Sequence, residues 1–272
     1  MKRSPAVTGT YYILTTALAL AFLAPLLWAV ISSVSPAPGT SQLQGYGFNN
    51  YRTLFEYGLG LPSYLWHSVV ISAIVVVVTV VVAATGGYAF ARYSFRGRNV
   101  LFIAVLAIMM VPYAALLIPM VVWTKQLGLQ NSLVGTGLVL TLFQLPFGVL
   151  IMRNAFAAIP RELEEAAAID GCGALGAFRR VMLPAVVPSV VTVGLFAYLA
   201  AWNDFMVSLY LLSMGNAPLP LALVNMRQQV MGVIDYGVTT AGVVVLTLPA
   251  LVLFLALQKY YVKGVLSGAV KG

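Results

Sequence analysis

The stretch EEAAAIDGCGALGAFRRVMLP, residues 164–184, concentrates ionisable side chains in a chain that is otherwise very apolar. Glu164, Glu165 and Asp170 lie at its start, and two arginines lie near its end. Carboxylate and guanidinium groups at this density can pair with a charged partner protein, and they can accompany a phosphate site if glycines cradle the phosphate. The first question is therefore whether this stretch binds a nucleotide or another protein.

A nucleotide site is not supported by the glycine spacing. Gly171, Gly173 and Gly176 form a GxGxxG pattern, which in dinucleotide-binding folds follows a strand and opens a helix. Here an alanine-rich helical segment precedes the glycines and a hydrophobic block follows. The sequence also contains no GxxxxGK[ST] phosphate loop and no HExxH or CxxC ligand cluster. We therefore expect no catalytic residues, no metal site and no cofactor in this chain.

The surrounding composition predicts a membrane protein. Of the 272 residues, 61% are hydrophobic and 8% are charged, whereas soluble domains carry about 25% charged residues. Six segments free of Asp, Glu, Lys and Arg can each hold a helix of about 20 residues, the length that crosses a bilayer. These segments are too long for strands, and an open strand would also leave its backbone N–H and C=O groups unpaired in lipid. We predict an all-α polytopic protein with transmembrane helices at about 11–34, 66–90, 99–123, 132–152, 187–210 and 237–258.

The basic residues predict the orientation of these spans. If the amino terminus is cytoplasmic, twelve of the 15 lysines and arginines fall on the cytoplasmic side, as the positive-inside rule requires. Only Arg52, Lys125 and Arg227 fall outside. The net charge of +8 is thus divided among loops and forms no continuous basic face for nucleic acid. The first apolar stretch exceeds the 7–15 residues of a signal-peptide core, so we expect it to be retained.

The charged stretch lies within a loop between the fourth and fifth predicted spans, about 153–186, which we call the charged loop. Pro160 suits a helix start, and the acidic residues that follow suit the positive end of a helix dipole. Gly171 is placed to end this first helix, and Pro184 to end a second short one. Two short amphipathic helices with a glycine corner are predicted. They could bind another protein, or they could simply lie on the bilayer surface.

The pattern of this loop resembles a known family. Glu165-Ala166-Ala167, Gly171, Val181 and Leu183-Pro184 follow the EAA-x3-G-x9-I-x-LP motif of ABC importer permeases, with valine in place of isoleucine. The six-span layout extends the resemblance over nearly the whole chain. Two shorter segments, 89–92 (AFAR) and 202–205 (WNDF), are similar to the carbohydrate branch of that family, in particular to the smaller maltose-type permease.

The resemblance implies a function and a set of partners. The chain, 1–272, would be one permease domain in a bacterial inner membrane, with both termini cytoplasmic. A second permease would complete the pathway, two ATPase subunits would hydrolyse ATP, and an extracytoplasmic solute-binding protein would deliver a sugar. The residues of the motif that would couple the permease to an ATPase are Glu165, Ala166, Ala167, Asp170, Gly171, Leu183 and Pro184.

A solute pathway needs polar and aromatic groups inside the membrane. Asp204 is the one acid within a predicted span, where a charge is expensive unless it faces a cavity or a partner. The candidate pathway residues are Gln144, Tyr198, Trp202, Asn203 and Asp204. Other roles remain open, because Trp and Tyr favour membrane interfaces and Asn and Asp can cap or pair helices. A non-sugar solute is an alternative, and a secondary transporter is another, although it would need further membrane-embedded charges.

Overall fold

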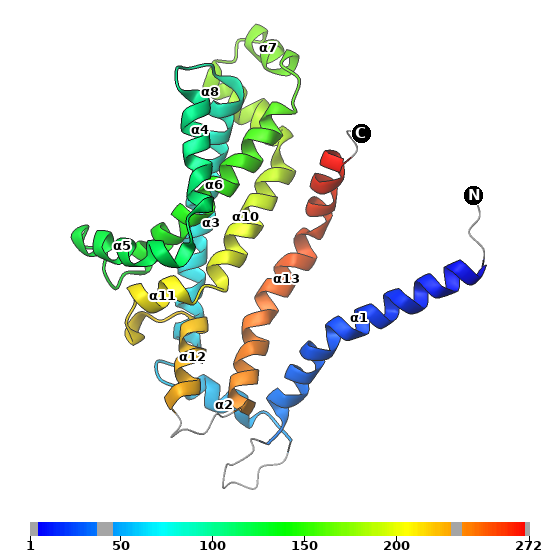
Figure 1. The fold of residues 1–272 in the computed structure, drawn as a ribbon, viewed down its shortest axis with the longest axis vertical. Helices are drawn as coiled ribbons and strands as arrows, with labels where there is room; N and C mark the ends of the chain where they lie inside the picture. Colours follow the sequence, from blue (N-terminus) through cyan, green and yellow to red (C-terminus); the bar gives the residue numbers. More distant parts are fainter. Residues whose placement is uncertain (1–4, 37–45, 230–235, 270–272) are drawn as a thin grey trace. The chain divides into compact units, whose positions relative to one another are not determined.

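The structure is a computed structural model that describes residues 5–36, 46–229 and 236–269, and the regular secondary structure in these ranges is helical (Figure 1). The α-helices are α1 Pro5–Val34, α2 Asn49–Glu56, α3 Leu61–Arg92, α4 Arg98–Ala107, α5 Tyr113–Gln126, α6 Leu133–Ala157, α7 Glu162–Ile169, α8 Ala174–Ala177, α9 Leu183–Ala185, α10 Val187–Trp202, α11 Met206–Leu211, α12 Leu219–Gln229 and α13 Tyr236–Ala269. The predicted all-α fold is confirmed.

Four helical segments of the described chain are long and apolar enough to cross a membrane alone. They are Gly9–Val34, Leu61–Arg92, Leu133–Ala157 and Tyr236–Gln258. Two further candidates are bent pairs, Arg98–Met110 with Tyr113–Gln126 and Ala174–Ala185 with Val187–Trp202, which bend by 105° and 77°. By length and composition the described chain thus holds four candidate spans, or six, the predicted number, if each bent pair counts as one.

The third predicted span, at about 99–123, is not one continuous helix. α4 passes into a short 3-10 turn, Ile108–Met110, and the chain is extended at Val111 (φ −78°, ψ 128°) before α5 begins. Pro112 explains the break, because a residue before proline is driven out of the helical region and proline itself has no N–H to donate. In Figure 1, α5 accordingly leaves the direction of α4 at a steep angle.

The fifth predicted span, 187–210, is also interrupted. α10 ends at Trp202, and α11 starts four residues later. Asp204 lies in the gap and accepts hydrogen bonds from the backbone N–H groups of Val207 and Ser208, at 3.3 and 3.0 Å. A side chain that binds the following backbone competes with helix continuation, and this explains the stop.

The chain divides into two compact units, Met1–Pro62 with Ala222–Leu248, and Ser63–Leu221 with Pro249–Gly272. In the first unit, Asn50 of α2 donates to the carbonyl oxygens of Ser33 and Ser35, each at 2.9 Å, and thereby holds the end of α1. The packing in this unit is tight enough that a Cβ on Gly237 would lie 2.6 Å from Asn50 Nδ2.

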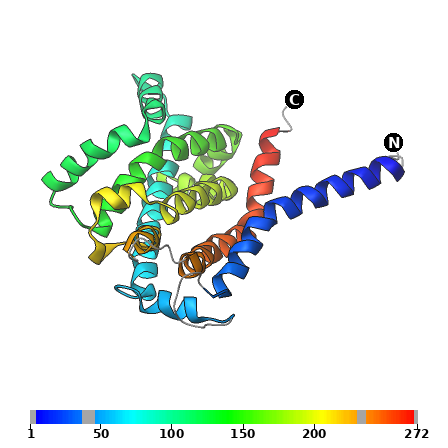
Figure 2. The ribbon, with the colours of Figure 1, turned by 60° about the horizontal axis from the view of Figure 1, so that its bottom comes forward.

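In the second unit, α6 packs against α10, as both views show (Figures 1 and 2), and side chains of α3 lie against both helices. Gly148 of α6 faces both neighbours, since a Cβ there would meet Ala83 of α3 at 3.0 Å and Val193 of α10 at 3.3 Å. Small residues at such points allow membrane helices to approach closely. The charged loop lies beyond the ends of α3 and α6, where Figure 1 shows α7 and α8.

Candidate coupling site and solute pathway

The first half of the charged loop is a short helix ended by a glycine corner, as predicted. Gly171 has φ +80°, a conformation that glycine adopts without steric strain. The N–H of Cys172 donates to Ala167 O at 2.9 Å and that of Gly171 to Ala168 O at 3.1 Å. These two bonds form a Schellman motif, which pairs carbonyl groups that the end of α7 would otherwise leave free.

The second half of the loop differs from the prediction, because Pro184 does not end its helix. The helical run continues from α8 through a π-turn, Phe178–Met182, into α9, and Pro184 lies in the first turn of α9. Because the run is continuous, Pro184 has no N–H to donate to the preceding turn, and the run departs from α-helical hydrogen bonding in the π-turn directly before it. The helical run ends instead at Val186, where the chain bends toward α10.

The predicted coupling residues are mostly exposed. Glu165, Ala166, Asp170 and Gly171 face solvent, whereas Ala167 is buried. Of the others, Leu183 is half-buried and Pro184 is exposed. The exposed surface of the loop also carries the large apolar side chains Leu163, Ile169 and Leu175, of which Ile169 is 86% exposed. Exposed apolar side chains of this size mark a surface that contacts either another protein or the membrane.

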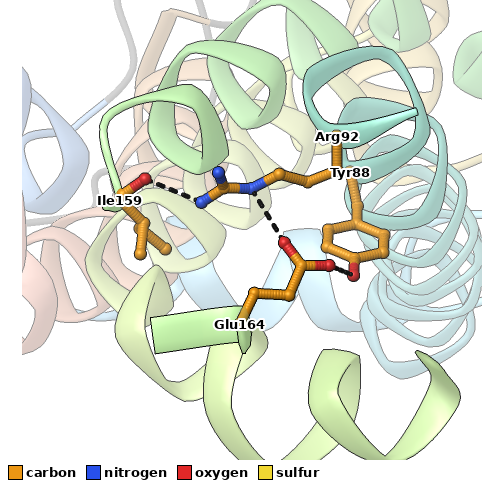
Figure 3. Close-up of polar contacts among 4 residues, drawn as sticks. All are labelled: Tyr88, Arg92, Ile159 and Glu164. Carbon is orange, nitrogen blue, oxygen red and sulfur yellow. Dashed lines mark hydrogen bonds and ion pairs between the residues drawn. The ribbon is translucent and has the colours of Figure 1, made fainter. Parts of the chain in front are cut away.

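Glu164, next to the predicted Glu165, binds within the chain (Figure 3). Its Oε1 accepts a hydrogen bond from the Tyr88 hydroxyl, and its Oε2 lies 3.4 Å from Arg92 Nε. Arg92 in turn donates through Nη2 to Ile159 O at 2.8 Å. We call these four residues, Tyr88, Arg92, Ile159 and Glu164, the Glu164 clamp.

The sequence prediction missed the Glu164 clamp, although part of its signal was present. Tyr88 and Arg92 are four residues apart at the end of a helix, so they lie on one face. The sequence could not pair them with Glu164, which is 76 positions beyond Tyr88.

Two of the predicted pathway residues come together at the break in the third span. Gln144 of α6 and Asp204 line a cavity of about 370 Å³ with Tyr113 and Phe143, whose rings meet edge to face at 4.7 Å. Asp204 is buried, and its carboxylate accepts from the Tyr113 hydroxyl at 2.9 Å and from Ser208 Oγ at 3.0 Å, in addition to the two backbone groups. The structure therefore gives Asp204 an internal role as a link between segments.

The other three candidates lie elsewhere. The rings of Tyr198 and Trp202 stack at 5.4 Å and line a larger, mainly apolar hollow of about 970 Å³ beside α3. Asn203 is exposed, and its side-chain amide donates to Leu199 O at 2.8 Å. The five predicted pathway residues thus form two groups and one separate residue.

Comparison with known proteins identifies the family of the chain. Residues 83–267 match the family described as "Binding-protein-dependent transport system inner membrane component". The chain is 34% identical to the trehalose transport system permease protein SugB of Mycobacterium tuberculosis, over 97% of this chain and 98% of SugB. It is 32% identical to the arabinooligosaccharides transport system permease protein AraQ of Bacillus subtilis, over 94% and 92%.

Among solved structures, the fold is similar to a chain of a bacterial ABC transporter involved in the import of the acidic polysaccharide alginate. The TM-score is 0.78, the identity is 22%, and the match covers 96% of this chain and 99% of that chain. At this identity the similarity concerns the fold.

Proposed function

The chain belongs to the family of binding-protein-dependent transport system inner membrane components, as the transmembrane permease subunit of an ABC importer, and we propose that it carries a sugar or a sugar derivative. The substrates in the names of its relatives support this proposal, since these are trehalose and arabinooligosaccharides. A non-sugar solute is the alternative, and it would be taken by the same pathway.

The cavity beside Gln144 is the proposed place of solute contact in the membrane. A sugar offers hydroxyl groups and apolar ring faces, and this cavity combines a side-chain amide with the aromatic rings of Tyr113 and Phe143. Tyr198 and Trp202 provide a stacked aromatic surface on the other side of α10. We assign both groups to the pathway, which a second, related permease would complete.

The proposal that ATP drives transport rests on one observation, the exposed α7 surface with Glu165 beside Ala166 and Ile169. The sequence has no phosphate loop of its own. We therefore place ATP on two separate ATPase subunits, one of which would cover this surface, and assign delivery of the solute to an extracytoplasmic binding protein. In this assembly the whole chain acts as one permease domain of the inner membrane.

The ATPase must be cytoplasmic, so the charged loop and both termini are proposed to face the cytoplasm. The distribution of lysine and arginine along the sequence supports this orientation. The lone cysteine, Cys172, follows Gly171 in the charged loop and reports on the side directly. An impermeant thiol reagent should not label Cys172 in sealed cells but should label it in inside-out vesicles from which peripheral proteins have been stripped. Labelling in sealed cells would reverse the orientation.

The function itself is tested by purifying the tagged chain with the products of its neighbouring genes. An ATPase and a second permease should co-purify, and proteoliposomes with the binding protein should take up radiolabelled trehalose or an arabinooligosaccharide only when ATP is inside. Methionine serves as the non-sugar probe. Sugar uptake in the absence of ATP would favour a secondary transporter, and ATP-dependent uptake of methionine alone would favour the non-sugar alternative.

A further inference from the structure

We propose that Glu164 is a positioning residue, which fixes the charged loop to the ends of α3 and α6 so that movement of a partner on α7 enters these two spans. The inference rests on the proposed coupling to an ATPase. It separates two adjacent glutamates by role: Glu165 faces outward to the partner, and Glu164 faces inward to the permease itself.

The Glu164 clamp joins three segments through one buried cation. The Arg92 side chain at the end of α3 is 6% exposed, and the paired Glu164 side chain of α7 is 28% exposed. The same guanidinium donates to Ile159 O, two residues beyond the end of α6 (Figure 3). A buried charge left without its partner is strongly unfavourable, so the ion pair with Arg92 holds Glu164, and with it α7, in place.

The Tyr88 ring attaches the other half of the loop at the same point. It packs against Phe178, the first residue of the π-turn, at 4.9 Å between ring centroids, and against Phe156 of α6 at 5.3 Å. Met182 at the end of the π-turn is fully buried in the same cluster. Tyr88 therefore contacts both halves of the charged loop, through its hydroxyl on Glu164 and its ring on Phe178.

α3 and α6 are in close contact directly beside the clamp. A Cβ on Gly87 would lie 2.5 Å from Met152 Cβ and 2.8 Å from Arg153 N. Tightly packed interfaces transmit displacement because they compress little. A displacement of α7 would thus be transmitted to α3 and α6 through Glu164. The chain itself connects the loop to α10 only after the π-turn and the 77° bend.

Glu162 provides a matched control for a test of the clamp. It is exposed and lies in the same first turn of α7 as Glu164, so either Glu→Gln substitution removes one negative charge from the same helix end. Glu164→Gln removes the ion pair with Arg92. Tyr88→Phe removes the hydroxyl bond and keeps the aromatic packing, which guards against a variant that simply fails to fold.

The first measurement is hydrogen exchange of backbone amides 165–171 in the purified full-length subunit. Exchange should become faster by roughly tenfold in Glu164→Gln, since the negative charge that pairs with the buried Arg92 guanidinium has been lost, and it should also rise in Tyr88→Phe, which loses the hydroxyl that donates to Glu164. Glu162→Gln should exchange as the wild type does. Wild-type exchange in Glu164→Gln and Tyr88→Phe would overturn the clamp, whether or not an ATPase partner is found.

The second measurement asks whether the clamp transmits movement. In the importer purified with its ATPase subunits, MgATP should change the exchange of amides 84–92 at the end of α3, and Glu162→Gln should retain that change. Glu164→Gln should lose at least about half of it while it keeps its ATPase subunits, because the path through Arg92 is broken. An unchanged response in Glu164→Gln would show that the movement bypasses α3. A wild-type chain that binds no ATPase would instead contradict the proposed function.

Discussion

Tyr113, the first residue of α5, donates its hydroxyl hydrogen to Asp204 Oδ1 over 2.9 Å. The bond joins two interruptions in membrane segments, the one before α5 and the one after α10. Asp204 Oδ1 also accepts from Val207 N, and Oδ2 accepts from the backbone and the hydroxyl of Ser208. Both oxygens of the carboxylate that borders the cavity thus already accept hydrogen bonds from groups of the protein.

Asp204→Leu should therefore destabilise the folded subunit. The change leaves the Tyr113 and Ser208 hydroxyls and two backbone N–H groups without their acceptor, and unpaired buried groups cost about 1–3 kcal/mol each. We expect the variant to insert normally, since the apolar spans are unchanged, but to unfold at a clearly lower temperature in detergent and to lose uptake. Asn203→Ala should unfold close to the wild-type temperature, because Asn203 bonds only locally at the surface. An Asp204→Leu protein of wild-type stability that still loses uptake would make Asp204 a solute contact and not a structural link.

The α3–α6 contact can be tested with two adjacent glycines. Gly87→Ala places a methyl group 2.5 Å from Met152 Cβ, whereas the nearest atom to a Cβ on Gly86 is Val149 Cγ2 at 3.8 Å. Both changes raise helix propensity equally. Gly87→Ala should lower stability by about 1–3 kcal/mol through overpacking, and Gly86→Ala should be neutral or slightly stabilising. Equal thermal shifts for the two variants would mean that α3 and α6 are not in the close contact described.

The glycine corner of the charged loop has its own matched pair. Gly171 has φ +80°, and Gly173 has φ −67°; a Cβ on either would meet nothing within 4 Å. Gly171→Val should cost about 1–2 kcal/mol, since a side chain in the left-handed region meets its own backbone, and it should reduce ATPase retention and uptake. Gly173→Val should have a much smaller effect on both. If the two valine variants retain the ATPase and take up solute equally well, the angle between α7 and α8 is not what the partner recognises.

The sequence was sufficient for the features that depend on local patterns. Apolar length predicted the helical membrane fold, and Pro160, the acidic residues after it and Gly171 predicted a helix ended by a glycine corner. Pro112 was also visible, but proline is tolerated within the described helices α5 and α6, at Pro119 and Pro146. Proline alone therefore did not show where the third span would break.

The missed features depend on contacts between distant residues. No local signal separates Glu164, which pairs within the chain, from Glu165, which is exposed, because both follow the same pattern in one helix turn. Likewise, Asp204 was recognised as an expensive charge within a span, but the partner that explains it, Tyr113, is 91 residues away. Such pairings require knowledge of how α3, α5, α6 and α10 pack.

The central claim is that an ATPase subunit binds α7 at Glu165 and drives solute movement through this chain. Its most direct test is ATPase retention and ATP-dependent sugar uptake, measured on the same preparations of wild type, Glu165→Lys and Glu162→Lys. Both variants reverse one exposed charge in the first turn of α7, so they perturb the helix dipole alike. The account predicts that Glu165→Lys loses most of its ATPase and its uptake, while Glu162→Lys keeps the greater part of both. Full ATPase retention and normal uptake in Glu165→Lys would contradict it.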